Sequence, residues 1–125
     1  MKKAPTIPTE QEEQEALIRW CDNHPDRRAS FIYSHLNGLR ASIGAVIKAK
    51  KAGARKGIPD LFLPIPCGQY HGLYIEMKRL KGGRLSPEQK EWIQTLSYAG
   101  YKAEVCKGHQ AAIAVIVKYL KLPTI

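Results

Sequence analysis

The chain has 125 residues, enough for one compact domain with a hydrophobic core of its own. Hydrophobic residues make up 44% and charged residues 25%, and no stretch reaches the roughly 18 apolar residues of a membrane span, so a globular protein rather than a membrane protein is expected. Twenty Lys and Arg against eleven Asp and Glu leave a net charge of +9, which favours an anionic partner, nucleic acid before a membrane surface.

The N-terminal part predicts a short lead and then a helix. We expect residues 1–8 to be disordered and residues 9–125 to form a single domain. Thr9 is a candidate N-cap, and Glu12 three residues later completes a capping box. Apolar residues then repeat at helical spacing as far as Cys21.

The middle of the chain alternates short strands with one helix. An aromatic and apolar run predicts a strand over 31–35, and Asn37-Gly38 predicts a turn. Helical spacing of apolar residues follows over 41–52. Two further strands are expected over 61–65 and 73–78.

The C-terminal part begins with a second capping box, formed by Ser86 and Gln89, and this helix is expected to end at Gly100. A strand over 101–106 and a helix over 109–121 complete the chain. The order α, β, α, β, β, α, β, α predicts the α/β class, with a small mixed β-sheet flanked by helices.

The strand over 73–78 carries the first candidate for chemistry. Alternation places Glu76 and Lys78 on the same face, and a hairpin through the preceding turn would bring Asp60 beside Glu76. Converging carboxylates, with the Met77 backbone carbonyl as a further oxygen, form a site for Mg²⁺ or Mn²⁺. The plain alternative is a turn aspartate and a solvated Glu-x-Lys pair worth ~0–1 kcal/mol.

Two polar residues fall on the apolar faces of their predicted helices. Gln89 is explained locally by the cap at Ser86, yet it shares a face with buried positions and needs an inner partner, such as a metal-site water or a phosphate. Glu13 aligns with Leu17 and Trp20. An inward carboxylate is costly unless it binds a metal or pairs with a buried Lys or Arg, and both alternatives remain open for Glu13.

Basic residues precede Asp60 and follow Lys78. Such segments would contact phosphates and give salt-sensitive affinity that depends little on base sequence. The alternative is a solvated lysine-rich surface. The candidates for DNA contact are Lys50, Arg55, Lys56, Arg79, Lys81 and Arg84.

Four motifs together resemble the VRR-Nuc family of the PD-(D/E)xK nuclease superfamily. They are Gly57-Ile58-Pro59-Asp60-Leu61, Tyr74-Ile75-Glu76-Met77-Lys78, Leu85-Ser86-Pro87-Glu88-Gln89-Lys90 and Ala99-Gly100-Tyr101.

The resemblance implies a restriction-endonuclease-like core. Asp60 and Glu76 would be the metal-binding acids, Lys78 the catalytic lysine, Gln89 the characteristic glutamine, and Glu13 the acidic position of the first helix. Stand-alone members of this size look like virus or bacterial proteins, similar to Holliday junction resolvases that act as two-fold dimers on branched DNA. The chain has no P-loop, and no nucleotide cofactor is expected.

Three functions follow as hypotheses. The first is a metal-dependent DNA endonuclease that selects DNA structures such as Holliday junctions or flaps. The second is a non-catalytic basic DNA-binding module with a nuclease-like fold, and the third is a nuclease acting on RNA. The three cysteines form no C-x-x-C pair, which fits a reducing cytoplasm. The resemblance implies the cytoplasm of a bacterium or of a virus-infected cell.

Overall fold

The computed structural model describes residues 6–35 and 42–123. The elements in chain order are α1 (Glu10–Asn23), the 3-10 helix η1 (Arg27–Phe31), β1 (Tyr33–Ser34), α2 (Ile43–Lys51), β2 (Leu61–Leu63), β3 (Leu73–Lys78), α3 (Pro87–Tyr98), β4 (Lys102–Lys107) and α4 (His109–Leu120). Both predicted capping boxes, Thr9 with Glu12 and Ser86 with Gln89, are present. The expected turn at Asn37-Gly38 lies outside the described residues, as do residues 1–5 of the expected lead.

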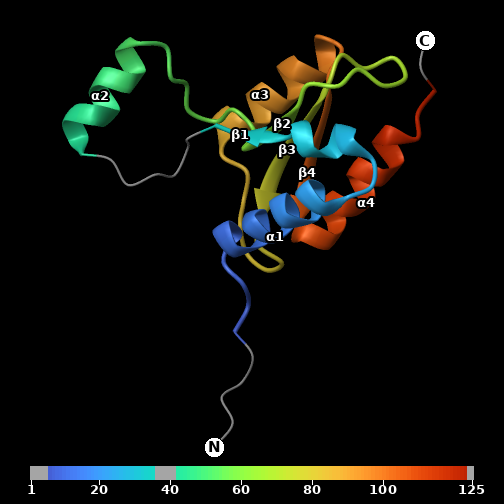
Figure 1. Ribbon diagram of the computed structural model, residues 1–125. Helices are drawn as coiled ribbons and strands as arrows, with labels where there is room; N and C mark the ends of the chain where they lie inside the picture. Colours follow the sequence, from blue (N-terminus) through green and yellow to red (C-terminus); the bar gives the residue numbers. More distant parts are fainter. Residues whose placement is uncertain (1–5, 36–41, 124–125) are drawn as a thin grey trace, which may run out of the picture.

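The strands form one sheet in the order β1-β2-β3-β4. β1 and β3 both run antiparallel to β2, whereas β4 runs parallel to β3. The sheet is therefore mixed, and helices cover it (Figure 1). The predicted α/β class is confirmed.

Two predicted strands are shorter than expected. The segment 31–35 contributes only Tyr33 and Ser34, because Phe31 still belongs to η1. Asp26 caps η1 by accepting a hydrogen bond from the Arg28 N–H at 3.0 Å, a local signal that the aromatic run obscured. The strand expected over 61–65 ends at Leu63, since Pro64 has no N–H to donate to a neighbouring strand.

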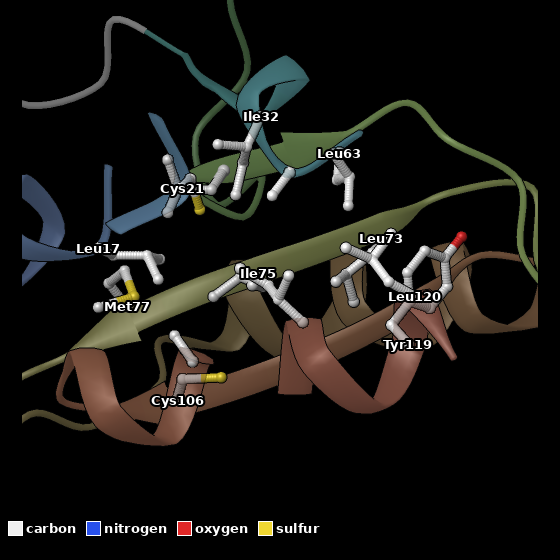
Figure 2. Close-up of a cluster of buried hydrophobic side chains, with 14 of the residues drawn as sticks. Leu17, Cys21, Ile32, Leu63, Leu73, Ile75, Met77, Cys106, Tyr119 and Leu120 are labelled. Carbon is white, nitrogen blue, oxygen red and sulfur yellow. The ribbon is translucent and has the colours of Figure 1, made fainter. Parts of the chain in front are cut away.

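The hydrophobic core lies between the sheet and the helices α1 and α4. Figure 2 shows Leu17 of α1, Ile75 of β3 and Tyr119 of α4 reaching into it, and all three side chains are almost fully buried. The Tyr119 hydroxyl is satisfied there because it donates to the Ile65 carbonyl at 2.6 Å. One face of each central strand is thus committed to packing, which leaves the alternate face for the polar residues of β3.

Helix α3 lies on that second face of the sheet and packs mainly against β4. Helix α2 has no buried residue and stands apart from the sheet and the other helices in Figure 1. No helix among the described residues is long and apolar enough to cross a membrane.

Candidate metal centre

The strand register places Asp60 beside Glu76. Leu61 pairs with Ile75 across the antiparallel strands β2 and β3, so Asp60, one residue before β2, falls opposite Glu76. The Met77 N–H donates to Asp60 Oδ2 at 3.0 Å and fixes the aspartate at this edge of the sheet. The two carboxylates expected to converge are therefore brought together.

A third carboxylate comes from Glu10, the first residue of α1. One carboxylate oxygen each from Glu10, Asp60 and Glu76 lies within 4.8 Å of the other two. We call these three residues the candidate centre. Nothing in the sequence singles out Glu10, because an acidic residue in the first helical turn is already explained by the helix dipole.

For Glu13, both a metal and a buried Lys or Arg are expected alternatives, and its contacts in the structure lie at the start of α4. Its buried carboxylate accepts from the His109 N–H at 2.7 Å and lies 3.1 Å from His109 Nδ1. The N-cap of α4 is Gly108, which has no side chain to cap the helix, so Glu13 of α1 supplies the cap from across the fold. Its partner among the described residues is thus the N-terminus of α4, and no lysine or arginine there pairs with it.

The electrostatics of the candidate centre are compatible with a bound cation. Glu76 is 1% exposed, and its Oε1 is buried without a hydrogen-bond partner among the residues that the structure describes. Burial, together with the hydrogen bond and the negative charge of Asp60, raises the pKa of Glu76 to about 8, although Lys78 opposes the shift. Burial and the charge of Asp60 also raise the pKa of Glu10. An oxygen-rich cluster with one buried unpartnered atom fits a hard divalent ion such as Mg²⁺ or Mn²⁺.

Lys78 and Gln89 complete the surroundings of Glu76. The Lys78 Nζ lies 3.7 Å from Glu76 Oε2 and donates to Gln89 Oε1 at 3.2 Å. Gln89 Nε2 donates to Glu76 Oε2 at 3.2 Å. The same Gln89 Oε1 accepts from the Ser86 N–H at 2.9 Å. Gln89 therefore caps α3 and also points inward, as both interpretations of the sequence expected. Its inner partners are Glu76 and Lys78.

The loop that leads into Asp60 packs on the start of α3. Gly57 has a φ of 95°, and a Cβ there would lie 2.7 Å from the Glu88 carbonyl carbon. Only glycine satisfies both conditions without strain. This close approach ties the Asp60 segment to the helix end that carries Gln89.

All six basic residues expected to contact DNA are exposed. Five belong to the two segments that flank the candidate centre: Arg55 and Lys56 before Asp60, and Arg79, Lys81 and Arg84 after Lys78. Lys50 differs, because it lies on α2, apart from the sheet (Figure 1).

Comparisons with known proteins agree on one family. The family model of the VRR-NUC domain matches residues 7–110. A solved structure titled "VRR_NUC domain protein" is 33% identical, with 95% of this chain and 93% of that chain covered and a TM-score of 0.83. The comparison with curated proteins gave no match.

Proposed function

The chain belongs to the VRR-NUC domain family, and from this premise we propose that it is a Mg²⁺- or Mn²⁺-dependent DNA endonuclease that hydrolyses phosphodiester bonds. The observation that carries the proposal is the buried, unpartnered Oε1 of Glu76 within a cluster of three carboxylates. Membership of the family does not by itself say whether the chain binds a metal or cleaves DNA. The three carboxylates and the unpartnered oxygen are a reason to propose both.

The candidate centre would hold the metal. Glu10, Asp60 and Glu76 offer carboxylate oxygens, and the Met77 carbonyl remains a candidate for a further ligand. When bound, a divalent ion offsets negative charge on the phosphate and lowers the pKa of water. The ion would also reduce the repulsion between ionised carboxylates and a phosphate placed at the centre.

Lys78 would act on the scissile phosphate. Its ammonium group, held by Gln89 and Glu76, is fixed before the substrate arrives and can orient the attacking water or stabilise the charge that grows in the transition state. Gln89 acts through these two side chains, as a positioning residue. Glu13 is left out of the proposed metal shell because its carboxylate caps α4.

DNA would be held by the basic segments that flank the centre, through its phosphates. The proposal has three further parts. They are a preference for Holliday junctions or flaps, action as a homodimer, and a cytoplasmic setting in a bacterium or virus-infected cell. The first two rest on the resemblance to junction resolvases. A two-fold dimer would place two centres across one junction. Three unpaired, buried cysteines support a reducing compartment, and the bacterial or viral source rests on the resemblance.

Cleavage of matched, labelled DNAs tests the proposal: linear duplex, single strand, flap and four-way junction, each with Mg²⁺, Mn²⁺ or EDTA. We expect metal-dependent cutting that is lost in Lys78→Ala and Glu76→Ala. Lys118→Ala, an exposed lysine on α4, serves as the matched control and should cut normally. Paired cuts confined to the junction would support a dimeric resolvase, and cuts in flaps a broader repair nuclease. Tight binding without cutting under any metal would contradict the proposal and favour a non-catalytic DNA-binding module.

A further inference from the structure

Two rows of side chains run across the sheet on the face that carries the candidate centre. The first row contains Asp60 and Glu76. His35 extends it, because the His35 N–H donates to the Asp60 carbonyl at 3.1 Å. The strand register sets Tyr33, Phe62 and Tyr74 opposite one another in the second row. Rows on one face are two residues apart, so about 7 Å separates them along the strands.

The second row consists of aromatic rings in mutual contact. Phe62 stacks on Tyr74 with ring centroids 4.3 Å apart. Tyr33 meets Phe62 edge-on at 5.9 Å. Tyr101 precedes β4 and lies beside the second row rather than in it, because Tyr74 pairs with Ala103, but its ring meets Tyr74 edge-on at 5.4 Å. Gly72 makes room for the row, since a Cβ there would lie 2.8 Å from the Phe62 ring. We call Tyr33, Phe62 and Tyr74, together with the adjoining Tyr101, the aromatic row.

The aromatic row does not belong to the hydrophobic core, whose members lie on the other face of the sheet. The main packing of α3 is against β4, the edge of the sheet remote from Tyr33. Tyr33 is 50% exposed, and the other three rings are partly exposed. Cross-strand aromatic pairs stabilise any sheet, but that role does not require the rings to be accessible or to border the candidate centre.

We propose that the aromatic row stacks unpaired DNA bases beside the phosphate that is cut. The proposal rests on the proposed nuclease function and specifies its substrate class. Aromatic side chains stack on bases of any sequence, while basic residues follow the backbone. Here the row borders the candidate centre on one face, and the exposed residues of the two flanking segments provide the cations. A single DNA strand would thus stack its bases on the aromatic row and place its phosphates against the basic residues.

This placement selects for DNA with unpaired nucleotides close to the cut. In an intact duplex the bases are stacked on each other and paired, so their faces cannot reach the rings without the cost of unpairing. A flap, a frayed end or a junction provides unpaired or easily unpaired bases. The row therefore gives a physical reason for structure selection that does not need contacts to particular base edges.

Equilibrium binding in EDTA tests the row without any cleavage. Affinities for a flap DNA and for a fully paired duplex would be measured with the unaltered chain, Tyr33→Ala, Tyr33→Trp and Tyr98→Ala. Tyr98 is 95% exposed on α3 and is the matched control. We expect Tyr33→Ala to weaken flap binding roughly tenfold and to leave duplex binding unchanged. Tyr33→Trp should preserve flap binding, and Tyr98→Ala should change neither.

Equal losses on both DNAs, or no loss on either, would overturn the stacking role. So would a Tyr33→Ala protein whose mass, measured by light scattering, falls from two copies to one, because the row would then be an interface between copies. Thermal melting of each variant excludes unfolding as the cause. Since the measurement needs no cutting, a chain that binds flaps through the row but never cleaves would contradict only the proposed nuclease function.

Discussion

Gln89 Nε2 donates to Glu76 Oε2 at 3.2 Å, which joins the first turn of α3 to the most buried carboxylate of the candidate centre. The same amide accepts from Lys78 and from the Ser86 N–H. One side chain therefore begins a helix and fixes two groups of the site. This dual use makes the contribution to stability and the contribution to chemistry separable by mutation.

Gln89→Ala should reduce both stability and cleavage, whereas Ser86→Ala should reduce mainly stability. Loss of an N-cap costs about 1 kcal/mol, and both variants break the capping box. Only Gln89→Ala also releases Lys78 and Glu76, so we expect its single-turnover cleavage rate at saturating DNA to fall at least tenfold further than that of Ser86→Ala. Urea unfolding and single-turnover kinetics measure the two effects. Equal rates in the two variants would show that Gln89 is only a cap.

The stability of the metal-free protein should fall as the pH rises from about 4.5 to 8. The pKa of Glu76 is raised to about 8 in the folded chain, so within this range the folded state holds a proton that the unfolded state has released. Glu76→Gln carries no such proton and should flatten the profile. Thermal melting in EDTA at several pH values measures this. Mg²⁺ should also stabilise the unaltered chain more at pH 8 than at pH 5, because protons compete with the ion; a flat profile for the unaltered chain would contradict the assignment.

Glu10 and Glu13, one helical turn apart, should have opposite mutant phenotypes. Glu10→Gln is expected to weaken Mg²⁺ binding with little change in stability, since Glu10 belongs to the candidate centre. Glu13→Ala uncaps α4 and should cost about 1–3 kcal/mol of stability with metal binding unchanged in the folded protein. Calorimetric titration with Mg²⁺ and urea unfolding separate the two effects. A loss of metal affinity in folded Glu13→Ala equal to that in Glu10→Gln would place Glu13 in the metal shell.

Local patterns in the sequence predicted most of the elements and part of the site. Capping signals located two helix starts, and alternation along 73–78 placed Glu76 and Lys78 together. The remainder depends on contacts between distant segments. Glu10 lies beside Asp60 and Glu76, whereas Glu13 caps α4, because of how α1 packs against β3 and α4. The aromatic row likewise exists only through the register of several strands, which periodicity within one strand cannot supply.

The exposed basic segments should set the salt dependence of DNA binding. Each phosphate contact releases counterions, so its loss lowers the slope of log K against log salt concentration by about 0.9 for duplex DNA. We expect Arg84→Ala and Arg55→Ala each to reduce the slope by roughly this amount, and the double variant by about twice as much. Lys118→Ala, on α4 beyond the other face of the sheet, should leave the slope unchanged. Fluorescence anisotropy with a duplex at 50–200 mM salt measures the slopes. If Lys118→Ala lowered the slope as much as Arg84→Ala, the DNA would be bound by overall charge rather than by the segments beside the candidate centre.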